Sequence, residues 1–217
     1  MARTSVATDN FNRGSLGSNW TQTNTTHAGN LIISSSTVAD GSYSMQPTGN
    51  LASARWTGAG SFTDDQYASV VVASFTNNGG ANSANGVTVC NSGANATRSC
   101  YEAYVIQNST TTPTVVLAKW VNGTRTQLHS ATTSWSGNAS RIELEREGTT
   151  IRVMKDGTAL GGSYTQTDSD LSGGTPGLSC TSGATGDNWE GGNIGSSGVA
   201  RLVGGKLTHS ILLGAIA

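Results

Sequence analysis

The sequence is poor in charge: lysine, arginine, aspartate and glutamate together make up 12% of its 217 residues, and the formal net charge is -1. A chain with so few basic residues lacks the positive surface with which proteins bind nucleic acid or anionic membranes. No apolar run approaches the roughly 18 residues of a membrane-spanning helix. The first ten residues also lack the apolar segment of a signal peptide. We therefore expect no nucleic-acid partner, no membrane span and no signal peptide.

Proline is also scarce, with three residues, whereas glycine occurs 29 times. Glycine and asparagine therefore make most of the turns. The low charge does not indicate disorder, because disordered chains usually combine few apolar residues with a high net charge. Abundant threonine and glycine instead suit short strands joined by tight turns.

Cysteine occurs three times. Cys90 and Cys100 flank a short segment that is typical of a loop between two strands. Two interpretations stay open: a disulfide joins Cys90 to Cys100, or these two and Cys180 are three buried thiols.

The apolar residues follow the pattern of short strands separated by turn clusters, and no segment has a convincing helical period. An Asn122-Gly123 pair between two such runs predicts a tight hairpin. About ten strands at this spacing predict one all-β sandwich or barrel. The expected strands lie in residues 30–35, 52–56, 66–75, 85–90, 100–108, 114–131 and 140–160.

The opening stretch DNFNRGSLGSNW (9–20) resembles the first strand and turn of concanavalin A-like, laminin G-like jelly rolls. Further pieces follow in that family's order: DDQYASVVV, the hairpin GVTVC…CYEAYVI, the hairpin SRIELEREGTTIRVMKDGTAL, and GTPGLSC with GDNWEGGNI. The resemblance implies a jelly-roll sandwich of two antiparallel sheets with the first and last strands side by side. Phe11, Trp20 and Trp189 are then core aromatics. We expect a sandwich over residues 1–192 and an extension over 193–217.

The segment ELERE offers a candidate catalytic strand. In a strand, Glu143, Glu145 and Glu147 lie on one face at spacings of roughly 6–7 Å, a separation that suits the paired carboxylates of glycoside hydrolysis. Glucanases of the similar fold carry acidic residues at alternate positions of one strand. The competing interpretation is a half-exposed strand whose glutamates face water, with Glu145 opposite Arg152. We favour this second interpretation and expect no enzyme.

The resemblance also implies a calcium site where the two chain ends meet, since folds of this type often hold Ca²⁺ there. Asp9 and Asp187 are its candidate ligands, because calcium prefers oxygen donors. The alternative is that both aspartates cap turns. No other cofactor is expected.

Sugar binding requires exposed aromatic side chains together with amide, carboxylate and backbone hydrogen bonds. The chain has five tryptophans, enough for both a core and a binding platform. The candidate glycan-binding residues are Trp56, Trp120, Trp135, Tyr101 and Tyr104.

The last residues are unusually apolar for a chain terminus. They form either a docking segment or one more strand of the sandwich. The candidate assembly residues are Leu202, Val203, Leu207, Ile211, Leu212, Leu213 and Ile216.

These features together favour a non-enzymatic protein of a virion surface, such as a capsid decoration or tail-associated protein of a bacteriophage. Its C-terminal tail would bind other virion subunits or further copies of itself, giving an oligomeric or lattice-bound state. A carbohydrate-binding module is the alternative, and the two are compatible because many displayed copies make weak sugar contacts useful. A glycoside hydrolase or lyase using Glu143 and Glu145 ranks third.

Overall fold

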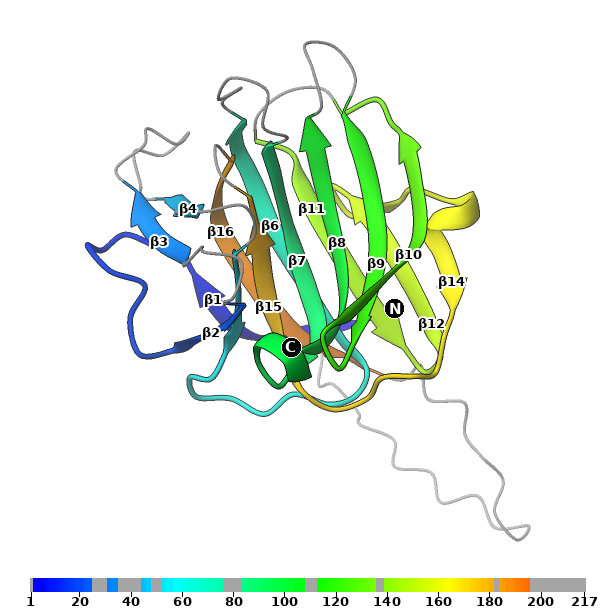
Figure 1. The fold of residues 1–217 in the computed structure, drawn as a ribbon, viewed down its shortest axis with the longest axis horizontal. Coiled ribbons are helices and arrows are strands. Elements are labelled where there is room, and N and C mark those ends of the chain that lie inside the picture. Colours follow the sequence, from blue (N-terminus) through cyan, green and yellow to red (C-terminus); the bar gives the residue numbers. More distant parts are fainter. Residues whose placement is uncertain are drawn as a thin grey trace, which may run out of the picture.

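The structure is a computed structural model that describes residues 2–24, 31–34, 44–47, 52–75, 83–107, 113–135, 139–181 and 184–195. The described residues form sixteen strands and two short 3-10 helices, η1 (Asn95–Thr97) and η2 (Gly162–Tyr164). The strands build two antiparallel sheets that face each other (Figure 1). None of the helices in this part of the chain is long and apolar enough to cross a membrane.

The larger sheet, called sheet A, contains nine strands. Its strand β1 (Arg3–Asp9) pairs with β16 (Ala184–Ile194), and β14 (Thr165–Thr167) pairs with β12. The main path runs through β13 (Thr158–Ala159), β12 (Thr150–Lys155), β11 (Arg141–Glu147), β6 (Gln66–Phe75), β16, β4 (Ser44–Pro47) and β3 (Leu31–Ser34).

The second sheet, called sheet B, contains seven strands. Their order is β10 (Thr124–Thr132), β9 (Thr114–Val121), β8 (Ser99–Gln107), β7 (Ser83–Ser92), β15 (Thr175–Cys180), β5 (Ala52–Trp56) and β2 (Trp20–Asn24).

Tight turns set the register of the hairpins. Asn122 and Gly123 between β9 and β10 have φ of 48° and 77°, and Asp156 and Gly157 after β12 repeat these values. Two successive positive φ angles are the signature of a type I′ turn, whose twist matches that of the strands it joins. The hairpin predicted at Asn122-Gly123 is confirmed.

Alternate residues of the strands point between the sheets and form the core. Val70, Val87, Leu117 and Leu144 are all 0% exposed. At one end of this core four aromatic rings pack edge to face, stacked or tilted, with centroids 4.8 to 6.0 Å apart, an arrangement that stabilises beyond simple burial. These rings belong to Phe11, Trp20, Trp56 and Trp189. The prediction that the opening segment and the last strand close the core together is confirmed.

The three cysteines are free and buried. The structure therefore has three buried thiols and no disulfide between Cys90 and Cys100. The reason is the bulge at Cys90, whose φ is 54°. Cys90 packs in the core between the sheets, whereas Cys100 lies on the outer face beside Arg98 and Glu102. Burial raises the pKa of Cys90 to about 12 and that of Cys100 to about 11.

The last strand continues past residue 192. Asn193 and Ile194 belong to β16 and pair with Thr4 and Arg3 of β1. Residues 196–217, including all the candidate assembly residues, lie outside the described part of the chain.

Candidate functional site: a polar pocket beside strands β1 and β16

A β-bulge shapes the last strand beside the first one. Thr8 of β1 lies opposite Glu190, and Asp9 lies opposite Trp189. The pairing of β16 with β6 shifts between Asp187 and Glu190, and Asn188 takes a φ of 49°. Bulges of this kind re-aim side chains. Here Trp189 enters the core while Glu190 and Asn188 border a pocket.

The loop after β1 is held by Asp9, whose side chain is 3% exposed. Its Oδ1 accepts from the backbone N–H of Phe11 at 2.8 Å and from Nη1 of Arg13 at 2.6 Å. Its Oδ2 accepts from Nη2 of Arg13 and from Nε1 of Trp20, both at 2.6 Å. The charged opening of the sequence thus ties the loop to the aromatic end of the core.

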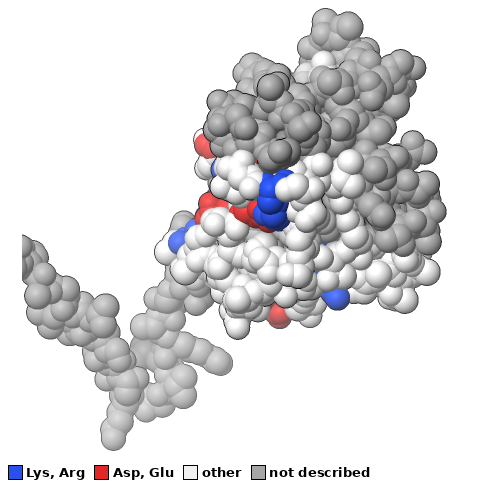
Figure 2. Space-filling model, turned by 90° about the vertical axis from the view of Figure 1, so that its left-hand side faces the viewer, with Lys and Arg blue, Asp and Glu red and all other residues white. Residues whose placement is uncertain are grey.

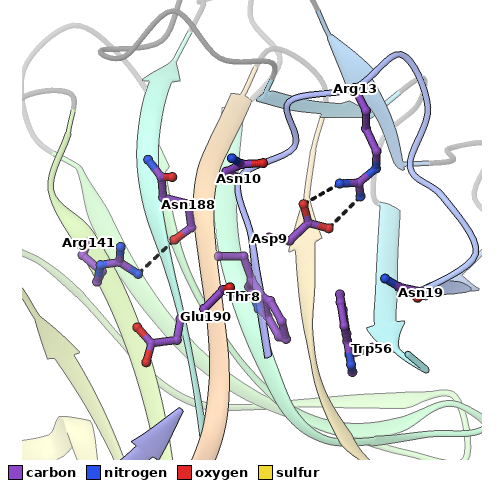
Figure 3. Close-up of a pocket in the computed structure, with 10 residues that line it drawn as sticks. Thr8, Asp9, Asn10, Arg13, Asn19, Trp56, Arg141, Asn188 and Glu190 are labelled. Carbon is purple, nitrogen blue, oxygen red and sulfur yellow. Dashed lines mark hydrogen bonds and ion pairs between the residues drawn. The ribbon is translucent and has the colours of Figure 1, made fainter. Parts of the chain in front are cut away.

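Between these elements lies an open pocket of about 480 Å³ (Figure 3). We call it the β1–β16 pocket. Most of its wall is polar, with asparagines, a threonine and ionic side chains. Its lining residues are Thr8, Asp9, Asn10, Arg13, Asn19, Trp56, Arg141, Asn188, Trp189 and Glu190. Figure 2 shows the side of the molecule that carries β1, β2 and β3, where acidic and basic side chains gather in one cluster amid mostly uncharged described surface.

Two ionic side chains on one wall come from sheet A. Nη1 of Arg141 donates to Oγ of Ser69 at 2.8 Å and to the backbone O of Asn188 at 3.0 Å. Oε1 of Glu190 accepts from the hydroxyl of Tyr67 at 2.5 Å. Burial raises the pKa of Tyr67, so the phenol stays protonated and acts as the donor.

The predicted calcium ligands do not fit a metal site. Both oxygens of Asp9 are occupied by N–H donors, one of them a guanidinium that repels a cation. Oδ1 of Asp187 accepts from the backbone N–H of Asn188 at 2.8 Å, so this carboxylate also has a donor from the protein. The described residues contain no group of three or more metal-ligating side chains.

The candidate catalytic glutamates lie on one outer face of β11, but they do not face water. Glu143 is 2% exposed and Glu145 6% exposed. Arg3 reaches across from β1 and pairs with both, and Glu143 also accepts from the N–H of Gly157 at 2.5 Å. Arg152 pairs with Glu145 at 3.2 Å, which confirms the predicted cross-strand pair.

Three of the five candidate glycan-binding aromatics are core residues. Tyr101 is 0% exposed, Trp135 5% and Trp56 7%, so none presents a ring face to solvent, and only Trp56 borders the pocket. Tyr101 was misassigned because the inner and outer faces of a strand differ by one residue of register, which the sequence alone does not fix beside a bulge such as the one at Cys90.

The other two aromatics, Trp120 and Tyr104, are half-buried on the outer face of sheet B. Trp120 donates from Nε1 to Glu102 at 2.9 Å and lies under the guanidinium of Arg98, 4.2 Å from its ring centroid. Tyr104 accepts from Arg125 at 2.7 Å and borders a smaller hollow of about 230 Å³.

Most residues that line the β1–β16 pocket were not among the predicted site residues. Asn10, Asn188 and Glu190 stand in the two segments that were interpreted as structural closing strands. The composition of these two segments could have indicated the pocket. They are rich in amide side chains and carry charges, which a strand that only closes the core does not need.

No family model matches the sequence, and no curated protein matches it. Solved structures do match. The carbohydrate binding module CBM66 from Bacillus subtilis is 17% identical, with 79% of this chain and 95% of that chain covered and a TM-score of 0.56. The Bacillus licheniformis β-glucanase is 12% identical, with 88% and 99% covered and a TM-score of 0.55.

A third similar structure is the CBM2 module of the evolved Dit of Lactobacillus casei BL23 phage J-1. It is 12% identical, with 89% of this chain and 97% of that chain covered and a TM-score of 0.53. Binding modules and a hydrolase thus share this architecture, and fold does not fix function. The chain has the concanavalin A-like jelly-roll fold, as its opening and closing segments indicated.

Proposed function

We propose that this chain is a carbohydrate-binding module that holds a glycan in the β1–β16 pocket. The observation that carries the proposal is the pocket itself. Its volume of about 480 Å³ lies within the range of small-molecule sites, roughly 300–1,000 Å³. The similar structures that are named as binding modules support the same conclusion.

The pocket wall has the chemistry that sugars require. Each sugar hydroxyl both donates and accepts, and an asparagine side chain offers an acceptor oxygen and two N–H donors. Asn10 and Asn19 are exposed at the rim, and Asn188 is half-buried. Thr8 adds a hydroxyl, and Trp56 adds an apolar border for the sugar's C–H groups.

Binding without cleavage fits the state of the candidate carboxylates. A glycosidase needs one carboxyl that can give a proton to the leaving oxygen and a second that attacks or activates water. Glu143 and Glu145 are instead held by Arg3, Arg152 and a backbone N–H and are nearly closed to solvent. Their arrangement suits a structural ion cluster.

The test is an array of immobilised glycans probed with the full chain and with Thr8→Trp. Thr8 is exposed and lines the pocket, so an indole at this position fills the space that a sugar would occupy. We expect binding by the unaltered chain and a loss of about tenfold or more in Thr8→Trp. Thr4→Trp is the matched control, because Thr4 is exposed on the same strand and does not line the pocket.

The outer face of sheet B is the competing location on the same chain. Tyr104→Ala and Trp120→Ala change the two half-buried aromatics there. We expect both variants to keep the array binding. If Tyr104→Ala and Trp120→Ala lost glycan binding while Thr8→Trp kept it, the glycan site would lie on sheet B.

A second candidate function is display on a phage particle. It is favoured by the similarity to a module of a phage Dit and by the apolar residues after Gly195. On this proposal residues 196–217 attach the module to virion subunits or to further copies. Size-exclusion chromatography with light scattering, on the full chain and on a chain ending at Gly195, tests this. If the full chain assembles and the shortened chain stays monomeric, attachment through the tail is supported. If both proteins are monomers, attachment through the tail is contradicted.

A further inference from the structure

The ionic side chains around the β1–β16 pocket differ in how much hydrogen-bonding capacity they have left. The Asp9 carboxylate already accepts four bonds, which fills the roughly four sites of its two oxygens. Arg13 gives its N–H groups to Asp9 and to the backbone O of Leu16. This pair holds the loop and has little left to offer a ligand.

Glu190 and Arg141 are different. Within the described part of the chain, Glu190 uses only Oε1, in its bond with Tyr67, and its Oε2 has no partner. Arg141 uses only Nη1 of its guanidinium, and its Nη2 and Nε make no bond to any described residue. Neither side chain forms an ion pair with a described residue, although both are only partly exposed.

The topology explains why these two opposite charges share a wall without pairing. Arg141 begins β11 and Glu190 lies on β16, with β6 between them. Two strand spacings and an offset of two residues along β6 place their backbones about 12 Å apart. The Arg141 guanidinium is fixed partway across by Ser69 of β6 and by the backbone O of Asn188. Figure 3 shows both side chains on the same side of the pocket, with Arg141 directed toward Asn188.

We propose that the β1–β16 pocket selects a neutral sugar unit, with one hydroxyl donating to Glu190 Oε2 and a neighbouring hydroxyl accepting from Arg141. The inference rests on the proposed function, because it names the class of glycan for that same pocket. Adjacent hydroxyls of one sugar ring can serve an acceptor and a donor at once. Hydrogen bonds to ionised groups are stronger than those between neutral groups.

The same two charges work against charged sugars. A uronic acid that places its carboxylate beside Arg141 also brings it near the free Glu190 oxygen, and repulsion by that oxygen offsets the attraction of the guanidinium. An amino sugar that pairs its cation with Glu190 likewise meets the repulsion of Arg141. A neutral unit satisfies both side chains without bringing a third charge into a partly desolvated site.

The experiment compares matched neutral and acidic oligosaccharides by isothermal titration calorimetry. The probes are oligogalactosides against oligogalacturonides and oligoglucosides against oligoglucuronides, each pair of equal length, chosen by the glycan array. The proteins are the full chain, Glu190→Gln and Arg141→Gln. The control is Glu147→Gln, a half-buried glutamate of β11 that does not line the pocket.

We expect the unaltered chain and the control to prefer the neutral partner by about tenfold or more. Glu190→Gln loses about tenfold in neutral binding, the cost of one hydrogen bond to a charged group, and gains the acidic partner, because Arg141 is then unopposed. Arg141→Gln also loses neutral binding but gains no acidic binding.

Equal binding of both partners by the unaltered chain, or an unchanged preference in Glu190→Gln, would overturn the neutral-sugar inference while leaving glycan binding intact. Failure to bind any glycan on the array would count against the proposed function itself.

Discussion

Replacing Asp9 by asparagine tests whether the opening segment is held as the structure indicates. The Asp9 side chain is 3% exposed and pairs with an Arg13 side chain that is 34% exposed. Breaking a buried ion pair by removing one partner costs roughly 3–5 kcal/mol. Because Arg13 can turn to water, we expect a loss at the lower end of this range, about 3 kcal/mol in the free energy of unfolding. The asparagine amide also places its own N–H donors opposite the N–H groups of Arg13 and Trp20, which now donate to Oδ2 of Asp9.

Urea unfolding followed by tryptophan fluorescence measures this loss, since Trp20 bonds directly to Asp9. The matched control is Asp170→Asn, whose side chain is 56% exposed and shares Lys119 with Asp168. A surface pair of this kind contributes at most about 1 kcal/mol. If Asp9→Asn lost less than about 1 kcal/mol, the anchoring role given to Asp9 would be wrong.

Three further predictions concern other parts of the sandwich. Burial raises the pKa of the Cys90 thiol to about 12 and that of Cys100 to about 11. Both thiols should therefore resist a thiol reagent at pH 8 until the chain is unfolded in denaturant. Fast reaction of the folded chain would contradict their burial. Burial alone would raise the pKa of Asp168, but hydrogen bonds from Lys119 and Tyr101 outweigh it and lower the pKa. This carboxylate therefore stabilises the fold above its unfolded pKa of about 3.9, and the stabilisation is lost as the pH falls toward the lower folded pKa. Carboxyl NMR should show a higher Asp168 pKa in Lys119→Met, and an unchanged value would refute the assignment. Glu145→Gln should cost about 2 kcal/mol in urea unfolding, because two ion pairs are lost; a normal free energy of unfolding with loss of a glycan-cleaving activity would restore the catalytic interpretation.

The fold was predictable from the sequence because local patterns agree with the global arrangement. Asn122-Gly123 specifies a turn that fits the twist of β9 and β10. The alternation of Ile142 and Leu144 with glutamates specifies which face of β11 enters the core. The pairing of the chain ends followed from the resemblance of the two terminal segments to one family.

The β1–β16 pocket was not predictable in the same way, because it depends on a bulge and on long-range contacts. Asn188 and Glu190 border the pocket only because β16 gains one residue against β6 between Asp187 and Glu190. Arg3 closes the β11 glutamates from solvent across 142 residues of chain, a contact that no local pattern encodes. Cys90 and Cys100 looked like partners in a hairpin, but the bulge at Cys90 places them on opposite faces of sheet B.

The central claim is that a glycan occupies the β1–β16 pocket, and side-chain NMR locates the ligand most directly. A titration with the best oligosaccharide from the array would follow the side-chain amide signals of Asn10, Asn19 and Asn188 and the indole N–H of Trp120. We predict that the three asparagine signals shift together with one binding constant and that the Trp120 signal stays in place. Shifts at Trp120 with unmoved asparagines would contradict the account and place the ligand on sheet B.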